Sequence, residues 1–505
     1  MEPIGTVISA PGPSASRFSF VINEDAGSIP VRMNQFVMLD TEEGKMIARV
    51  SDIYKTNRYF VRAESVREYE RSGKSMTEIF PAQRWEYLVG EAVPLGVYTG
   101  KSVGRAGFPP SPGTRVYIAD NDILGDFLGF DREKGLNIGT VHHHNLDVKL
   151  NLTKLFQKHL AILAMSGAGK SYLTSVMIEE LLERKPEDGQ LAVIVIDTHG
   201  EYIGFAEDEN YRDRVRVVRG KDFRIGVPGI TSSLIADFIP EMSSVQEREL
   251  NRILSEVKNE MKGKVYDLKT VADRIAEDER IKPSTRDVLL TILAQLQRTR
   301  LFSYSDNPSL DQIAKQGHLT VLDISDMTSL RKRQMVVTYL GRKLFSARSK
   351  NLIPPFLFIV EEAHNFAPEG VKQEQAISRG IIQKIAREGR KFHASLGLIS
   401  QRPIQLSTTA LSQCNTHIIL RVTNPYDLDH IGRSSEGLTR DALDTISSLR
   451  VGEALIVGEA VNYPLFLKVR KRKSKKSERG IPLEEAAVKY YQEKLSRDED
   501  VENFM

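Results

Sequence analysis

The sequence contains a single cysteine, Cys414, among its 505 residues. One cysteine excludes an internal disulfide and a zinc site built from several cysteines, and it suits a reducing cytoplasm, where we expect the protein to act. Long hydrophobic runs are also missing. Runs such as Leu191 to Ile196 are far too short to span a bilayer, and no secretory signal is visible. We therefore predict that no part of the chain inserts into a membrane.

A marked excess of either charge is absent as well. The 70 Lys and Arg residues nearly balance the 67 Asp and Glu residues, which leaves a formal net charge of +3. A role with nucleic acid would therefore need basic groups gathered on a local surface. With 41% hydrophobic and 27% charged residues, the composition is that of an ordinary globular protein, and the length favours two or three domains.

The pattern of the chain changes near residue 148. Residues 1–148 consist of short β-like runs separated by Gly, Pro, Asn and Asp turns, which predicts an all-β barrel or sandwich. Residues 149–467 alternate strands and helices, as in an α/β domain with a parallel sheet. Amphipathic helices at about 231–316 indicate a helical subdomain inserted in this core, and residues 468–505 read as a basic linker followed by a helix. The strands expected in the α/β domain are Leu160 to Leu163, Ala192 to Asp197, Thr320 to Ile324, Phe356 to Glu361, Ser395 to Ser400 and His417 to Arg421.

Three consecutive histidines, His142 to His144, raise the question of a metal site. Adjacent side chains of an extended segment alternate faces and do not converge easily on one ion, and no cysteine or acidic cluster stands nearby. We expect a solvent-exposed loop or strand here rather than a metal site.

The stretch AMSGAGKS, Ala164 to Ser171, predicts a nucleotide site. It lies between a short apolar strand and a run with apolar residues at helical spacing, so its small residues fall on a strand-to-helix turn. Backbone N–H groups and the helix dipole can hold phosphate there, Lys170 adds a positive charge, and Ser171 can hold Mg²⁺. The candidate ligands of ATP in this loop are Ser166, Gly167, Ala168, Gly169, Lys170, Ser171 and Tyr172.

A second stretch, PPFLFIVEEAHNF, delivers Glu361 and Glu362 at the end of a buried strand. Ligands of open α/β sheets bind at the carboxyl ends of the strands. We assign Glu361 to the Mg²⁺ ion and Glu362 to the removal of a proton from the attacking water.

Two further strands end in polar residues at the same predicted edge. Asp197 closes one of them and Gln401 follows the other, where an amide could orient water or sense the γ-phosphate. Either residue could instead cap a turn. Arg387 and Arg390 lie on a helix between two strands and are candidates for an arginine that stabilises the transition state in a neighbouring subunit, with Arg387 the first choice.

The order of these motifs, AMSGAGKS, VIVIDTHGEY, IVEEAHNFAPEG, REGRKFHASLGLISQRP and GEALIVGEAVNYPLFLKVR, resembles the HerA branch of the HerA/FtsK superfamily over nearly the whole chain. The resemblance implies a HAS barrel followed by a RecA-like motor with a helical subdomain, assembled as a homo-hexamer. It also implies translocation of double-stranded DNA in end resection, together with a NurA-like nuclease. In such a motor Lys170 and Ser171 bind ATP and Mg²⁺, Glu361 and Glu362 form the Walker B pair, Gln401 is the sensor, and an arginine of REGRK reaches across the interface. This sequence departs from the usual loop at Ala164 and Ala168.

Three basic features are less specific. The family resemblance suggests that a basic residue before the P-loop strand touches the nucleotide, and Lys158 is the candidate. The run from Lys468 to Lys476 could contact DNA phosphates, or it could be a solvated linker. The run from Tyr211 to Arg224 is a candidate DNA grip, although alternation would place much of it in a strand. The helix after Leu483 resembles the family's C-terminal brace, which packs on a neighbouring subunit.

Two other functions remain open. A secretion or conjugation motor would share these motifs, and a nucleotide-gated assembly module could use ATP only as a switch that recruits a nuclease. Stimulation of ATP hydrolysis by duplex DNA separates both from a DNA translocase.

Overall fold

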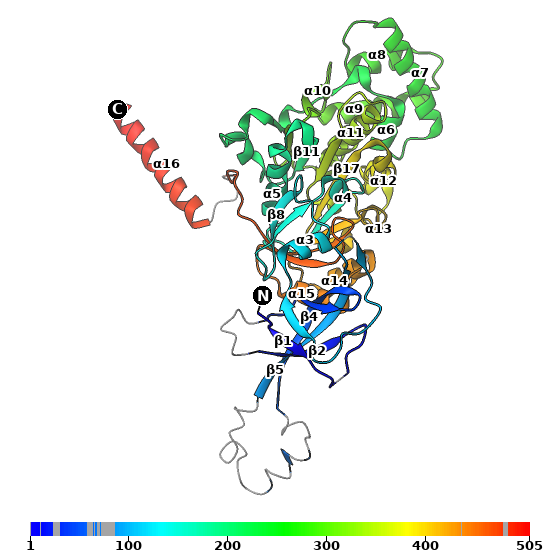
Figure 1. Cartoon of the computed structure of the whole chain (residues 1–505). Helices are drawn as coiled ribbons and strands as arrows, with labels where there is room; N and C mark the ends of the chain where they lie inside the picture. The colour runs from blue at the N-terminus through cyan, green and yellow to red at the C-terminus, as the bar shows by residue number, and fades with distance from the viewer. Residues whose placement is uncertain are drawn as a thin grey trace. The chain divides into compact units, whose positions relative to one another are not determined.

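A computed structural model of the chain describes residues 2–10, 12–23, 31–57, 64, 66–67, 71, 86–100, 102–435, 437–477 and 483–504, the last ten of them by their backbone only (Figure 1). The chain divides into two compact units. The first comprises Met1–Asn151, Gly437–Ile446 and Glu453–Arg470, and the second comprises Leu152–Glu436, Ser447–Gly452 and Lys471–Met505. Residues 453–467, which we predicted to belong to the ATPase domain, thus lie in the first unit together with residues 468–470 of the predicted linker, because their strands pair there.

The first unit contains a closed antiparallel barrel, so the predicted all-β N-terminus is confirmed. Six strands pair in the order β2-β1-β7-β3-β4-β5, and β5 pairs back onto β2 to close the barrel, while β6 (Val103–Gly104) extends β5. Gly90 on β5 lies against the ring of Phe20 on β2, and a Cβ atom at this position would come within 2.5 Å of that ring. Only glycine therefore fits here. The barrel strands are β1 (Gly5–Val7), β2 (Phe18–Ile22), β3 (Phe36–Thr41), β4 (Gly44–Asn57), β5 (Glu86–Tyr98) and β7 (Arg115–Ile118).

The rest of the first unit is helix α3 (Asn121–Leu128) and a run of four antiparallel strands ordered β19-β20-β8-β9, with α15 (Arg440–Ser448) beginning in this unit. The strands are β8 (Leu136–Val141), β9 (Asp147–Leu150), β19 (Glu453–Gly458) and β20 (Leu465–Val469). His142 to His144 follow β8. The expectation that they are solvent-exposed is wrong, because all three are partly buried and His144 Nε2 accepts a hydrogen bond from the Phe36 N–H at 3.0 Å. Among the described residues no cluster of His, Cys, Asp and Glu could hold a metal ion.

The second unit is built on a parallel sheet with the strand order β12-β15-β11-β16-β17-β10-β18. Six of these seven strands bury every residue, and this burial on both faces explains why most of them are apolar runs in the sequence. All six strands expected in this domain are confirmed to within two residues at either end. The strands are β10 (Leu160–Leu163), β11 (Ala192–Asp197), β12 (Val215–Arg219), β15 (Leu319–Asp323), β16 (Phe356–Val360), β17 (Ala394–Ser400) and β18 (Thr416–Ile419).

Helices follow these strands in the alternating order that the sequence predicts. They are α4 (Leu152–Phe156), α5 (Lys170–Glu183), α11 (Leu330–Ser349), α12 (Arg379–Glu388), α13 (Thr408–Leu411) and α14 (Pro425–Ser434). Because parallel strands all point the same way, their carboxyl ends form one edge of the sheet and their amino ends the other. This distinction decides where each candidate site residue lies.

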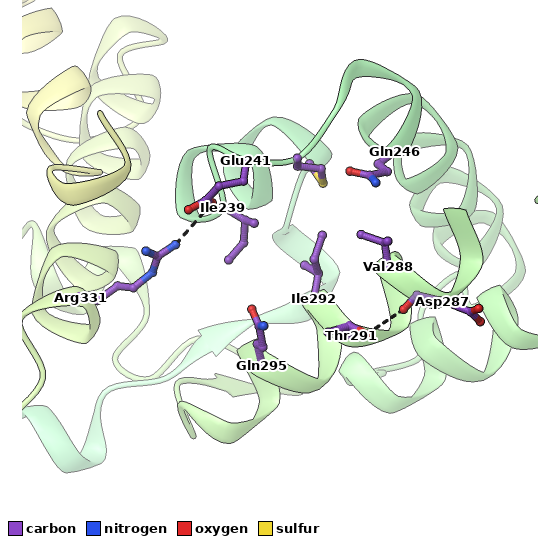
Figure 2. A pocket seen from close by; sticks show the side chains of 10 residues that line it. Ile239, Glu241, Gln246, Asp287, Val288, Thr291, Ile292, Gln295 and Arg331 are labelled. Carbon is purple, nitrogen blue, oxygen red and sulfur yellow. Dashed lines mark hydrogen bonds and ion pairs between the residues drawn. The ribbon is translucent and has the colours of Figure 1, made fainter. Parts of the chain in front are cut away.

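The helical subdomain occupies the predicted stretch and is drawn in green at the top of Figure 1. Its helices are α6 (Ser232–Phe238), α7 (Ser244–Glu260), α8 (Leu268–Glu277), α9 (Pro283–Arg298) and α10 (Leu310–Ile313), and a short parallel pair, β13 (Ile225–Gly226) with β14 (Phe302–Ser303), flanks it. A cavity of about 540 Å³ lies beside α9, and Arg331 at its wall lies 3.9 Å from the carboxylate of Glu241. Figure 2 shows the side chains that line this cavity. None of the predicted site residues lines it.

The basic run after β20 is not a solvated linker where the structure describes it. Residues 471–477, which we call the strap, pack along α5. Glu179 on α5 accepts hydrogen bonds from the N–H groups of Lys473 and Ser474 and from the Ser474 hydroxyl, at 2.7 to 2.9 Å. The Lys473 ammonium lies 2.7 Å from Glu183, and Ser474 is buried. The prediction of a free basic linker is therefore wrong for residues 471–477, because hydrogen bonds and an ion pair hold Lys473 and Ser474 on α5.

Beyond the strap, the predicted C-terminal helix is confirmed as α16 (Leu483–Phe504). Among the side chains of α16 that the structure describes, four large apolar or aromatic ones are exposed: Leu483, Val488, Tyr490 and Tyr491. Among the described residues, no helix combines the length and the apolar character needed to cross a bilayer.

Candidate nucleotide site

The P-loop lies where the sequence predicts it, between β10 and α5 at the carboxyl edge of the sheet. Gly167 and Gly169 have φ angles of +75° and +102°, which glycine adopts without a steric penalty. Ala164 has no such requirement, since its φ is not positive, and its N–H donates to the Ser400 carbonyl at 3.2 Å. Alanine at this position therefore fits the loop.

The first turn of α5 carries the groups that would meet a phosphate. Gly169 is the N-cap, and no side chain caps the free N–H groups there. Uncapped N–H groups and the helix dipole favour an anion at this end. Lys170 follows as the first helical residue and is 8% exposed. Ser166 is exposed on the loop, whereas Tyr172 is turned to the strap, because its hydroxyl accepts the Arg472 N–H at 2.6 Å.

Glu361 lies directly after β16 and faces the P-loop. Its Oε1 accepts from the Ser171 hydroxyl at 3.4 Å, and its Oε2 accepts from the N–H and hydroxyl of Thr198, both at 3.2 Å. The side chain is 1% exposed. Burial and the neighbouring carboxylates of Asp197 and Glu201 raise its pKa well above the ordinary value. A cation bound between Ser171 and Glu361 would offset this cost, so the residues present fit Mg²⁺.

Glu362 combines three unusual features. It has left-handed backbone angles, φ 49° and ψ 47°, which are uncommon outside glycine. It is 5% exposed, and its Oε2 has no hydrogen-bond partner in the described part of the chain. Burial raises its pKa, while Lys170 and His199 act in the opposite direction. A strained, buried carboxylate with a free oxygen is suited to accept a proton from a bound water.

Asp197 ends β11 and is completely buried. Its Oδ1 accepts from the N–H groups of His199, Gly200 and Glu201, and its Oδ2 accepts from the N–H of Tyr202. With these four hydrogen bonds Asp197 caps the turn after β11, which was the alternative interpretation of this residue. The carboxylate fixes the loop that brings Thr198 to Glu361.

Gln401 follows β17 at the same edge, beside Ser400. Its backbone N–H interacts with the Glu362 carboxylate and opposes the rise of the pKa of Glu362. The Ser400 hydroxyl accepts from the Arg402 N–H at 3.1 Å and lies 3.1 Å from His364 Nδ1. The sheet thus brings Lys170, Ser171, Glu361, Glu362 and Gln401 to one edge.

Arg387, Arg390 and Lys158 lie at the opposite edge. Arg387 and Arg390 come just before β17 begins, whereas Gln401 comes just after it ends. Seven strand residues span about 20 Å, more than an arginine side chain can bridge. Lys158 likewise precedes β10, so the strand separates it from the P-loop that follows. Both arginines are exposed.

Sequence reasoning missed three residues of this site. Thr198 and Tyr202 contact the two oxygens of Glu361, and His364 Nδ1 lies 3.4 Å from Glu362 Oε2. Burial together with the positive charges of Arg402 and Lys170 lowers the pKa of His364 to about 4, so this histidine is neutral near pH 7. His364 comes two residues after the acidic pair in the sequence, and this short spacing could have identified it as a candidate site residue.

Comparison with known proteins gives matches over most of the chain. Residues 136–344 match the family model described as "Helicase HerA, central domain". A DNA double-strand break repair helicase HerA of Pyrococcus furiosus is 29% identical over 519 residues, covering 90% of each chain. A probable helicase of Methanocaldococcus jannaschii is 31% identical over 388 residues, covering 72% of each chain.

Two solved structures share the fold of much of this chain. VirB4 of Thermoanaerobacter pseudethanolicus superposes with a TM-score of 0.53 at 15% identity, over 68% of this chain and 98% of VirB4. The plasmid coupling protein TrwB, in complex with a non-hydrolysable ATP analogue, gives a TM-score of 0.50 at 13% identity, over 72% of this chain and 96% of TrwB. At these identities the likeness establishes the P-loop ATPase fold and nothing further.

Proposed function

The chain belongs to the HerA helicase family, and from this premise we propose that it is an ATP-driven motor that moves double-stranded DNA. The proposed assembly is a homo-hexameric ring, and the proposed setting is the processing of DNA ends in repair, together with a NurA-like nuclease. Curated relatives named as DNA double-strand break repair helicases support this setting.

The observation that carries the proposal is the pair Lys170 and Glu362. Both side chains are buried, the charge of Lys170 opposes the rise of the pKa of Glu362, and Oε2 of Glu362 has no hydrogen-bond partner in the described part of the chain. Lys170 would hold the β- and γ-phosphates of ATP, and Glu362 would accept the proton of the attacking water. A protein that only binds nucleotide has no use for a buried, strained base.

Ser171 and Glu361 would hold Mg²⁺ in this site. The ion would neutralise charge on the phosphates when bound. Thr198 and Tyr202 orient the Glu361 carboxylate, and Gln401 stands where its amide would sense the γ-phosphate or orient water.

Arg387 or Arg390 would complete the site of a neighbouring subunit. β17, which is about 20 Å long, separates them from the edge of the sheet that carries the P-loop of the same chain, and this separation supports action in trans. Lys158 shares their edge, so the nucleotide it would contact is also the neighbour's. An arginine supplied in this way raises hydrolysis by about 10³ to 10⁵-fold in other NTPases.

The decisive experiment is ATP hydrolysis with and without blunt duplex DNA, alongside a mass measurement of the assembly. A DNA motor is expected to hydrolyse ATP faster with duplex, in a particle of six chains. Hydrolysis that ignores duplex DNA would favour a secretion or conjugation motor, and nucleotide-dependent assembly without turnover would favour a switch that recruits a nuclease.

A mixing experiment tests the composite site. Lys170→Ala protomers lack the phosphate-binding charge and Arg387→Ala protomers lack the arginine, so rings containing both would hold some interfaces with an intact pair. Restored hydrolysis is expected in mixed rings. If verified mixed rings stay inactive, Arg387 does not act in trans, and Arg390 is tested in the same way.

A further inference from the structure

His159 links the arginine-bearing turn to the P-loop strand. It lies directly before β10, is 1% exposed, and has a φ of +63°, a left-handed conformation uncommon for a residue with a side chain. Both of its ring nitrogens are used. Nδ1 accepts the Leu396 N–H at 3.0 Å, and Nε2 therefore carries the proton and donates it to the Ala386 carbonyl at 2.9 Å.

Ala386 immediately precedes Arg387 in the last turn of α12. Carbonyl groups at the end of a helix lack the regular intrahelical donors and can accept from side chains instead. His159 supplies that donor for Ala386. Burial lowers the pKa of His159 to about 4, so the ring stays neutral near pH 7 and keeps one donor and one acceptor.

The turn after α12 is packed tightly against the same ring. A side chain at Gly389 would come within 2.3 Å of the Ala394 carbonyl and 3.1 Å of His159 Cε1. The backbone between Arg387 and Arg390 therefore has no room to shift toward His159. Its position is set by the histidine on one side and by the start of β17 on the other.

We propose that His159 is a positioning residue for the trans-acting arginine: it fixes the last turn of α12 to the start of the P-loop strand, which begins at the next residue. The proposal rests on the proposed function, since it requires that Arg387 or Arg390 completes a neighbour's site. A ring whose arginine turn is displaced by about 1 Å is expected to lose about 10²-fold in kcat. The KM for ATP is expected to stay within about twofold, because the P-loop of each chain is untouched.

Two conservative substitutions separate the two hydrogen bonds of the ring. The oxygen of His159→Asn can replace Nδ1 as acceptor for Leu396 but leaves Ala386 without a donor, whereas the amide nitrogen of His159→Gln can replace Nε2 and reach Ala386. The proposal predicts that His159→Gln retains most of the parent kcat and that His159→Asn loses it. The opposite ranking would mean that the contact with β17 is what matters, and it would overturn the proposal.

Mixed rings test the route of the effect. His159→Asn protomers keep an intact P-loop, so they are expected to regain hydrolysis when mixed with Lys170→Ala protomers, which supply the arginine. His159→Asn protomers are expected to stay inactive when mixed with Arg387→Ala protomers, because neither variant then provides a correctly positioned arginine. Rescue by Arg387→Ala instead of Lys170→Ala would assign His159 to the P-loop of its own chain and refute the proposal.

Three controls complete the design. Rings of Lys170→Ala with Arg387→Ala must recover activity, and their failure would sink the proposed function rather than the role of His159. His417→Asn removes another buried histidine of the same sheet, on β18, and is expected to hydrolyse ATP like the parent. If His159→Asn does not fold, Gly389→Ala displaces the same turn and is expected to give the same rescue pattern, and parent-like hydrolysis by Gly389→Ala would count against the proposal.

Discussion

Replacement of Glu362 by Gln is the most informative single change in the proposed active site. It keeps the size of the side chain and the left-handed backbone while it removes the group that takes the proton. Loss of a general base costs about 10² to 10⁴-fold in rate, or roughly 3 to 5 kcal/mol of transition-state stabilisation. Binding of ATP is expected to survive, because Lys170 and the P-loop remain.

The same change is expected to leave the fold at least as stable as the parent. Glu362 is 5% exposed and one oxygen has no partner in the described residues, and a buried polar atom in that state costs on the order of 1–3 kcal/mol. Because burial raises its pKa, the folded protein binds this proton more tightly than the unfolded chain does. Parent stability should therefore fall as pH rises from the ordinary glutamate value of about 4.3 through the raised folded value, and the glutamine variant should lack that contribution.

Two measurements check these expectations. Single-turnover hydrolysis and binding of a fluorescent ATP analogue separate chemistry from binding, and urea denaturation between about pH 4 and pH 8 reports stability. Glu277→Gln, at an exposed position of α8, is the matched control and should change neither. Hydrolysis by Glu362→Gln near the parent rate would refute the assignment of the base and move it to Glu361.

Three other expectations concern binding and stability. Lys170→Ala should weaken ATP binding itself, unlike Glu362→Gln, in the same analogue titration. Affinity for unrelated duplexes should be indifferent to sequence and should fall with salt by about 0.9 log units per log unit for each phosphate contacted, and a flat salt response would argue against a DNA channel. Asp197→Ala should destabilise the second unit by on the order of 3 kcal/mol or more, because four backbone N–H groups lose their acceptor, whereas exposed Asp273→Ala should be neutral in the same denaturation assay.

Local patterns predicted the features that depend on neighbouring residues. The strands of the parallel sheet are short apolar runs, and the P-loop glycines have the positive φ angles that require glycine, so both could be located from sequence. The direction of β17 also follows from the parallel topology, and it separates Arg387 from Gln401.

Contacts between residues far apart in the chain could not be predicted in this way. His159 and Leu396 are 237 residues apart, and Glu179 and Ser474 are 295 apart. The run KRKSKKS contains no local pattern that predicts its contact with glutamates of α5, so its composition favoured a linker. The left-handed backbone of Glu362 was hidden for a similar reason, since only the surrounding packing holds a non-glycine residue there.

The strap changes where the chain can be cut. A truncated chain that ends at residue 470, directly after β20, would leave the Glu179 carboxylate of α5 without its three donors from the strap. Loss of ATPase activity in such a truncation would then reflect damage to the helix that begins at Lys170 rather than the absence of α16. Truncations meant to remove only α16 should retain Ser477, the last described residue of the strap.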